Sequence, residues 1–270
     1  MRKLSYFSMM MMCVMTQITS FGQADSVKEK PKFKLGVYYN SHLNYYGRTD
    51  SLRSTGVFPV AELWFNKHLY INAAPVFVNN AVQKFDYAGT LLTAGYRFDV
   101  KKWSGNFYVL KPLYENSSQL VQSALKAQVS GTLTSRNKIV NITGGGDIKF
   151  SDNIDYGVTA GLDHIFRFPL KDNFVLVVDP SVNMYAGTRQ FTNTYYKKTG
   201  FLLFPGVEEE VSENVKDFRI LSYEASMPVI LVKGKFQFLA IPAWVMPQNL
   251  LNQEYGKEML YVTIGAKVSF

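Results

Sequence analysis

Apolar side chains recur at every second position over most of this chain, and this period constrains the fold more than any other feature. Near the C-terminus the apolar positions are Leu260, Val262, Ile264, Ala266, Val268 and Phe270. Successive side chains of a β-strand point to opposite faces, so this spacing gives a strand one apolar face. Residues 139–150 and 154–168 alternate in the same way. The pattern predicts an all-β protein.

Turn residues divide the alternating region into about twelve strands, with ten or fourteen as alternatives. We place them at 33–46, 56–65, 68–79, 87–98, 104–114, 120–134, 138–150, 154–168, 173–188, 217–232, 235–246 and 259–270. Short connections alternate with mostly longer ones, of which 189–216 is the longest. Short turns on one rim and longer loops on the other are typical of a transmembrane β-barrel.

The composition agrees with a folded β-protein and excludes other classes. Aromatic residues make up 15% of the chain and charged residues 19%, whereas disordered chains have few aromatics and much charge. No segment after the N-terminus reaches the roughly 18 apolar residues that a membrane helix needs. The net charge is +8 with dispersed Lys and Arg, which argues against a nucleic-acid partner.

The N-terminus resembles a secretory signal rather than part of the fold. Arg2 and Lys3 precede a short apolar run, and small residues around Gly22 suit a cleavage site. The alternative is a buried N-terminal helix. We expect a signal peptide at 1–22, an exposed polar lead-in at 23–32 and one barrel domain at 33–270. Cys13, the one cysteine, lies inside the signal, so the mature chain would have no disulfide and a charge of +6, with 27 basic against 21 acidic residues.

Barrel size decides which face of the strands meets lipid. Side chains fill the interior of a barrel of about eight strands, but twelve strands enclose a larger space. Apolar side chains could not pack closely there, so we assign the apolar face to lipid and the polar face to the lumen. A Lys or Arg facing lipid at mid-membrane would cost about 2–4 kcal/mol. The charged residues that we place in the lumen are Glu62, Arg97, Lys111, Lys126, Asp147, Asp163, Arg167, Asp179, Arg219, Glu224 and Lys267.

Prolines and aromatic residues fall at particular places in these strands. Proline cannot donate to a β-ladder, so prolines within the strands should mark bulges or strand ends. We expect this of Pro59, Pro75, Pro112, Pro180 and Pro242. Many aromatic residues lie near strand ends, where the interfacial girdles of membrane barrels occur.

The region 33–270 resembles the outer-membrane β-barrel proteins of Gram-negative bacteria. Its most specific part is the alternating strand from Tyr261 to the terminal Phe270, which resembles the signal that assembly machinery reads in this class. The resemblance implies an outer-membrane location, lipid as surroundings, and a role in insertion for Tyr261 and Phe270. The aromatic-rich strands and the Phe-Gly-Gln that ends the signal look similar to barrels from Bacteroidota.

No motif predicts catalysis, a metal or a cofactor. His42, His68 and His164 lack metal-ligand spacing, and no Gly-x-Ser-x-Gly sequence occurs. Gly144, Gly145 and Gly146 lie within an alternating strand and do not form a phosphate loop. We therefore expect a passive channel, or a barrel that binds or transports a small solute, with selectivity set by lumen charges. A plugged structural barrel that docks through its outer loops is one alternative, and an outer-membrane hydrolase or lipid-modifying enzyme is another.

Overall fold

A computed structural model describes residues 30–49, 52–82, 84–115, 125–151, 154–188, 217–250 and 256–270. The predicted signal at 1–22, residues 23–29 of the predicted lead-in and the loop 189–216 lie outside these described residues. Among the described residues, no helix has the length and apolar character needed to cross a membrane.

The regular secondary structure of the described residues is β-strand, apart from one short 3-10 turn, η2 (Lys171–Asn173). In chain order the strands are β1 (Lys32–Asn40), β2 (Asn44–Tyr45), β3 (Arg48–Thr49), β4 (Thr55–Trp64), β5 (Leu69–Asn79), β6 (Asp86–Val100), β7 (Trp103–Tyr114), β8 (Ala127–Ser135), β9 (Asn141–Phe150), β10 (Ile154–Asp163), β11 (Phe166–Pro169), β12 (Phe174–Val178), β13 (Ser181–Thr188), β14 (Phe218–Ser226), β15 (Val229–Lys233), β16 (Phe236–Pro247) and β17 (Met259–Ser269).

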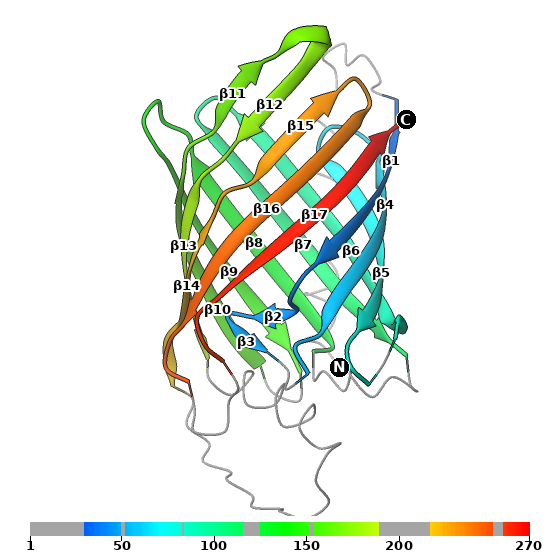
Figure 1. Ribbon diagram of the computed structural model, residues 1–270. Helices are drawn as coiled ribbons and strands as arrows, with labels where there is room; N and C mark the ends of the chain where they lie inside the picture. Colours follow the sequence, from blue (N-terminus) through cyan, green and yellow to red (C-terminus); the bar gives the residue numbers. More distant parts are fainter. Residues whose placement is uncertain are drawn as a thin grey trace, which may run out of the picture. The chain divides into compact units, whose positions relative to one another are not determined.

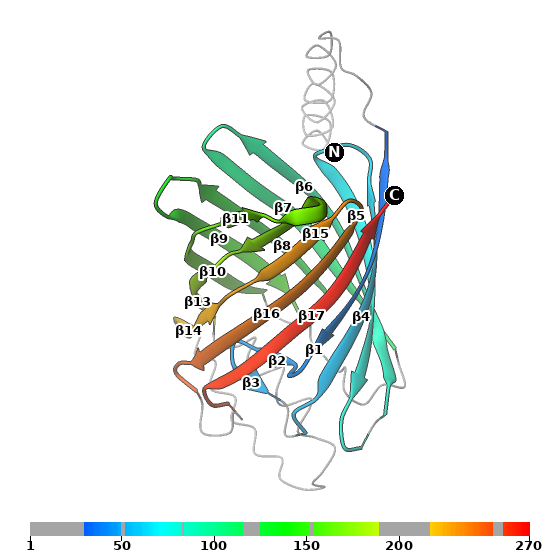
Figure 2. The ribbon, with the colours of Figure 1, turned by 45° about the horizontal axis from the view of Figure 1, so that its top comes forward.

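Fifteen of these strands form one closed antiparallel sheet. Its order is β11-β12-β15-β16-β14-β13-β10-β9-β8-β7-β6-β5-β4-β1-β17, and β17 also pairs with β16. Three barrel strands are each interrupted and appear as two halves. These halves are β10 and β11, β12 and β13, and β14 and β15. The described residues therefore build a closed barrel of twelve strands (Figures 1 and 2), which confirms the predicted fold class and strand number.

The connections separate into two rims, as the sequence predicts. Short turns join β4 to β5, β6 to β7, β8 to β9, β11 to β12 and β15 to β16, and we call this end the short-turn rim. The C-terminal end of β17 lies at the same rim (Figure 1). The longer connections, including 41–54 and 80–85, lie at the opposite end, the long-loop rim. Pairing of β1 with β17 closes the barrel between its two terminal strands.

Side-chain exposure separates the two faces of the sheet. On β1, Leu35 and Val37 are 42% and 53% exposed, whereas the alternate residues Lys34 and Tyr38 are less exposed. On β9, Ile142 and Ile148 are exposed while Asp147 and Lys149 are shielded. The apolar face therefore points outward, and the polar face points into the barrel.

Each of the five prolines expected at bulges or strand ends lies where one ladder is broken or ends, although four of them lie within strands and only Pro180 lies at a strand end. Pairing between β4 and β5 skips residues 58–60 and 74–76, where the register places Pro59 opposite Pro75. Pro180 separates β12 from β13. Pro242 accepts a backbone hydrogen bond at its carbonyl from Met227, in the break between β14 and β15. Pro112 pairs with β6 but lies beyond the last β7–β8 pair, Leu110 with Gln128.

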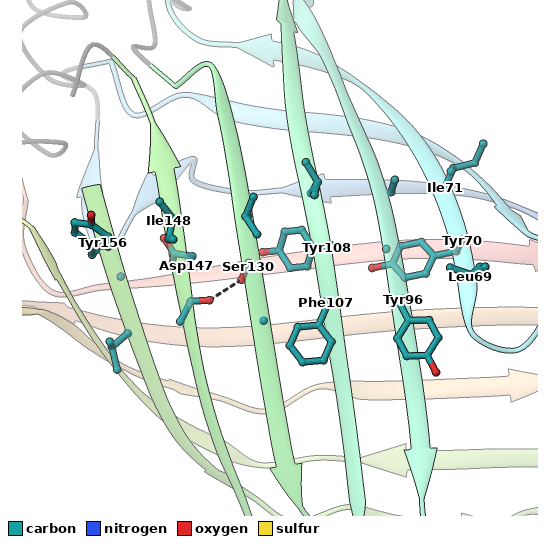
Figure 3. A pocket seen from close by; sticks show the side chains of 18 of the residues that line it. Leu69, Tyr70, Ile71, Tyr96, Phe107, Tyr108, Ser130, Asp147, Ile148 and Tyr156 are labelled. Carbon is teal, nitrogen blue, oxygen red and sulfur yellow. Dashed lines mark hydrogen bonds between the residues drawn. The ribbon is translucent and has the colours of Figure 1, made fainter. Parts of the chain in front are cut away.

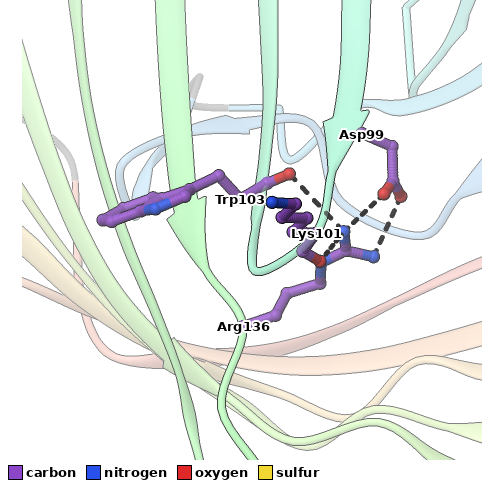
Figure 4. Close-up of polar contacts among 4 residues, drawn as sticks. All are labelled: Asp99, Lys101, Trp103 and Arg136. Atoms are coloured by element: carbon purple, nitrogen blue, oxygen red, sulfur yellow. Dashed lines mark hydrogen bonds and ion pairs between the residues drawn. The ribbon is translucent and has the colours of Figure 1, made fainter.

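A charged clamp holds two neighbouring turns at the short-turn rim (Figure 4). Arg136, just after β8, forms a two-nitrogen ion pair with the carboxylate of Asp99 on β6. Its guanidinium also donates to the carbonyl oxygens of Lys101 at 2.9 Å and Trp103 at 3.5 Å. The planar fork of arginine can bind a carboxylate and nearby carbonyls together. The β6–β7 turn is thereby tied to the β8–β9 turn.

Candidate functional site

A small hairpin inside the long-loop rim is the main departure from the predicted strand pattern. The first strand was predicted at 33–46, but β1 ends at Asn40, and β2 and β3 then form a separate two-stranded sheet. Tyr46 and Gly47 have φ angles of 54° and 77°, as a two-residue hairpin turn with left-handed central residues requires. The Gly47 amide donates to Asn44 Oδ1 at 3.1 Å and holds the turn together.

Arg48 fixes this hairpin to the barrel wall. The residue is only 2% exposed, and its guanidinium donates to the carbonyl oxygens of Leu221 and Gln248, both at 3.0 Å. Arg48 also forms a backbone bridge with Gly256. A Cβ on Gly47 would lie 2.9 Å from the ring of Pro247, so the turn approaches β16 closely. The hairpin is thus attached to β14 and to the β16–β17 connection.

The hairpin reaches across the lumen. Lys149 Nζ on β9 lies 6.0 Å from the ring centroids of both Tyr45 and Tyr46, and Tyr46 also packs against Tyr185 of β13 with centroids 4.9 Å apart. Five barrel strands separate β1 from β9 in either direction around the wall. The connection between β1 and β4 therefore contacts the opposite side of the barrel. Its strands β2 and β3 lie at the long-loop rim (Figure 1).

The wall that receives the hairpin carries buried charge. Lys149 forms an ion pair with Asp147, and both side chains are less than 10% exposed. On β10, Asp155 is 2% exposed and accepts a hydrogen bond from the Thr188 hydroxyl. Burial, together with Tyr46 and Asp147, raises the pKa of Tyr45 well above its usual value. Its phenol therefore stays neutral beside this charged wall.

Strand register places most of the predicted lumen charges on the inner face. Those on lumen-facing positions within strands are Glu62, Arg97, Asp147, Asp163, Arg167, Arg219, Glu224 and Lys267. Asp179, between β12 and β13, continues the inward positions of those strands. Lys126 lies just outside β8, where its amide donates to the Phe150 carbonyl oxygen at 2.6 Å.

The prediction that Lys111 faces the lumen is wrong. Lys111 shares its face of β7 with Val109 and Leu113, which are 49% and 46% exposed. It also pairs across the ladder with Leu92, another exposed outward residue. Lys111 lies three residues before Tyr114, the long-loop end of β7. A lysine near a strand end can extend its amine to the membrane interface, which makes this outward position tolerable.

A second polar cluster lies on the inner wall nearer the short-turn rim. Glu62 on β4 accepts contacts from Lys34 at 4.0 Å and Lys267 at 3.4 Å. The Trp64 indole donates to the same carboxylate at 2.9 Å and stacks on Tyr70 with centroids 4.7 Å apart. Tyr70 in turn donates to Asn106 at 3.0 Å. This cluster connects β17, β1, β4, β5 and β7.

Part of the inner wall is apolar, which the sequence did not predict. Phe236 and Phe238 of β16 are more than half exposed and point outward, so the alternate positions point inward. The register carries this inward face onto β15 and β12. The resulting apolar wall consists of Val175, Val177, Ile230, Val232, Leu239 and Ile241.

The residues predicted to serve insertion occupy different surroundings. Tyr261 points into the lumen, where its hydroxyl donates to Glu224 at 2.8 Å. Phe270 follows β17, is 61% exposed and stacks on Phe33 at 6.1 Å. Both placements are compatible with a terminal barrel strand, and the role in insertion stays a prediction.

The histidines considered in the sequence analysis have local partners in the described part of the chain. His42 Nδ1 lies 3.3 Å from the hydroxyl of its neighbour Ser41, and that hydroxyl accepts a hydrogen bond from the Val262 amide. Among the described residues, no cluster of three His, Cys, Asp or Glu could hold a metal ion. His164 packs edge-on against Phe166.

A shallow apolar groove crosses the outer face of β5 to β10 (Figure 3). Outward residues such as Ile71, Phe107 and Ile148 line it, and Gly131 and Gly146 leave its floor low. Ile71, Phe107 and Ile148 point away from the lumen, so the groove opens on the outside of the barrel.

Sequence reasoning missed the lumen role of Tyr45, Tyr46 and Arg48. Tyr45 and Tyr46 fell within the predicted first strand, 33–46, and Arg48 fell in the connection that follows it. The sequence signal for a hairpin turn at Tyr46 and Gly47 was weak. Two-residue turns favour Asn-Gly or Asp-Gly, whereas this turn is Tyr-Gly. A bulky residue with positive φ is uncommon, so only the contacts around Tyr46 identify the turn.

Comparisons with known proteins find similar folds but no family. No family model matches the chain, and no curated protein matches it. The KdgM porin aligns with a TM-score of 0.45 and 9% identity, covering 88% of this chain and 99% of the porin. An outer membrane channel from Pseudomonas putida F1 gives 0.47 and 11%, covering 92% and 98%. The NanC porin gives 0.46 and 8%, covering 87% and 98%.

Proposed function

We propose that this protein is an integral outer-membrane channel for small solutes, and that the β2–β3 hairpin restricts passage through it. The observation that carries the proposal is a closed barrel with buried charge on its inner wall and one loop that crosses the interior. A ring of charged side chains around a narrowed passage can select solutes by charge and size. Arg48, with its two 3.0 Å bonds, holds the hairpin in this crossing position.

The membrane location rests on the outward apolar face. Large exposed side chains cover β1, β7, β9 and β10, whereas a soluble protein of this size rarely exposes so much contiguous apolar surface. A closed barrel also leaves no unpaired strand edge, as the bilayer interior requires. The mature protein should resist carbonate extraction from outer membranes and show a heat-modifiable gel band. Release by carbonate without such a band contradicts the membrane assignment.

Conductance in planar bilayers tests the channel. We expect the unaltered protein to give small conductance steps. A variant with residues 44–49 replaced by a Gly-Ser segment of the same length should give steps several-fold larger. The matched control replaces residues 81–85 at the same rim and should conduct as the unaltered protein does. Arg48→Ala should give an intermediate result, with frequent transitions between small and large steps.

The same hairpin supports a second candidate, a plugged barrel that acts through its outer loops. The two candidates make opposite predictions for the hairpin-replaced protein. If neither it nor the unaltered protein conducts, the channel proposal is wrong and the plugged barrel stands. If both conduct equally, the hairpin does not restrict passage.

A further inference from the structure

Positive charge exceeds negative charge at the Glu62 cluster on the inner wall. Lys34 and Lys267 both contact the Glu62 carboxylate, at 4.0 Å and 3.4 Å. The charged groups that act on the Lys34 amine are Lys267, Glu62, Arg97 and Lys32, and Glu62 is the one acid among them. An internal carboxylate can neutralise only one of these cations, so the cluster holds a positive potential.

Glu62 has little capacity left to bind the surplus cations. One of its oxygens, Oε2, accepts from the Trp64 indole at 2.9 Å and also lies near Lys34, while Oε1 faces Lys267. Each lysine ammonium carries three donors. The side chains of Lys34 and Lys267 are 24% and 20% exposed and lie on the inner face, so each keeps some surface open to the lumen. They can donate to a further anion.

An aromatic surface adjoins the cations. Lys34 Nζ lies 4.5 Å above the Trp64 ring, and Trp64 stacks on Tyr70. These contacts fix both the amine and the ring, because a cation over an indole face is held by the ring quadrupole. A ligand would therefore meet a Lys34 amine that its aromatic neighbour already holds in place, without first ordering that side chain.

The apolar wall begins two strands away from Lys267 in the same row of the inner face. Lys267 pairs with Gln237, which pairs with Val232, which pairs with Val175, all on the inner face. Side chains that face each other on neighbouring strands are about 5 Å apart, so Val232 lies roughly 10 Å from Lys267. Ile230 and Leu239 continue the apolar surface in the next row.

We propose that this inner wall binds a small organic anion with an apolar body. The carboxylate, or another acidic group, would lie between Lys34 and Lys267 on the side away from Glu62. The apolar body would extend along Val232 and Ile230. The site faces the lumen near the short-turn rim, so the ligand would enter from that end. This inference rests on the proposed access of solutes to the lumen, but binding itself does not require passage past the hairpin.

Trp64 offers a local reporter for the site. The chain has three tryptophans, and Trp103 and Trp244 are 48% and 41% exposed on the outer face. The double variant Trp103→Phe, Trp244→Phe keeps Trp64, on the lumen face, as its single tryptophan, and it serves as the background protein. Octanoate is the probe, with acetate as the anion that lacks an apolar body and octylammonium as the cation of similar length. The folded state of each variant is checked by its heat-modifiable gel band.

Octanoate should change Trp64 emission in a saturable way, and acetate and octylammonium should not. Lys267→Gln should weaken octanoate binding about tenfold, as expected for a lost charge-assisted contact. Lys111→Gln removes an identical charge from the outer face and should bind as the background protein does. Ile230→Asn should also weaken octanoate binding.

Other outcomes contradict the inference. Equal responses to octanoate and octylammonium would show simple partition into detergent or lipid, and equal losses in Lys267→Gln and Lys111→Gln would exclude this site. A response to acetate as strong as that to octanoate would contradict the proposed contact between the apolar body of the ligand and the apolar wall. Conductance without octanoate binding refutes this site while leaving the channel, and binding by a protein that never conducts refutes the channel while leaving the site.

Discussion

Strands β9 and β15 line the same barrel but differ in how their residues are distributed. On β9, exposed Ile142 and Ile148 alternate with shielded Asp147 and Lys149. On β15, the sequence Val-Ile-Leu-Val is apolar on both faces, and all four residues are partly shielded. The difference reflects what each wall faces inside the barrel. β9 meets the tyrosines of the crossing hairpin, whereas β15 belongs to the apolar wall.

Alternation of apolar and polar residues in the sequence therefore depends on the surroundings of both faces of a strand. Where the lumen side needs polar groups, as at Lys149 beneath Tyr45, the period of two is strict. Where the lumen side is apolar, the period disappears although the strand remains. A strand without alternation in such a barrel thus points to a specialised inner surface.

The largest expected effect separates the two faces of β10. Val158→Lys places a charge on the lipid face and should lower the free energy of unfolding by about 2–4 kcal/mol. Thr159→Lys, one residue on, places the same charge in the lumen and should cost far less. Equilibrium unfolding in guanidinium, from lipid vesicles, measures both. Equal losses in the two variants would contradict the assignment of faces.

A smaller effect tests β15, where the sequence cannot assign the faces. Leu231→Asn should lower the free energy of unfolding by about 1–3 kcal/mol, since an amide without a partner would face lipid. Ile230→Asn should cost less than about 1 kcal/mol, because the lumen can hydrate the amide. The same unfolding measurement applies. A reversed order would place Ile230 against lipid and remove the apolar wall from the lumen.

The smallest effects concern the turns that end the two walls. Near β9, the ion pair of Arg136 with Asp99 joins the β6–β7 turn to the β8–β9 turn. At the end of β15, Lys233 lies 4.3 Å above the Phe174 ring. Arg136→Ala should cost about 1 kcal/mol, at the upper end for exposed pairs because the contact is two-pronged. Lys233→Ala should cost about 0.5 kcal/mol, as an exposed cation–ring contact does. Thermal melting of folded protein in detergent should resolve the order, and a larger loss for Lys233→Ala would oppose it.

Much of the fold could be predicted because a strand's alternation is a local property. β9 was predicted at 138–150 and spans Asn141–Phe150, and β17 was predicted at 259–270 and spans Met259–Ser269. The strand predicted at 120–134 is β8, Ala127–Ser135, and residues 120–124 lie outside the described part. Length and strand number could assign the apolar face to the outside of the barrel, because barrel size follows from strand number.

The candidate site could be predicted only in part. A charge within a strand suggested a lumen position, but Lys111 shows that the register of the neighbouring Val109 and Leu113 decides the face. The hairpin depends on contacts between residues far apart in sequence, such as Tyr46 with Tyr185. The apolar wall was missed because β12 and β15 are apolar on both faces, so neither face stands out.

The attachment of Arg48 has a consequence for how the chain assembles. Its guanidinium bonds to carbonyl groups 173 and 200 residues further along the chain. Contacts of such high sequence separation form late, because the intervening chain must first be ordered. The hairpin cannot reach these carbonyls until β14 and β16 are in place beside the closing β1–β17 pair. Resistance of the Arg48 peptide bond to trypsin should therefore appear together with barrel closure. The time at which this resistance appears would report when the last step of folding occurs.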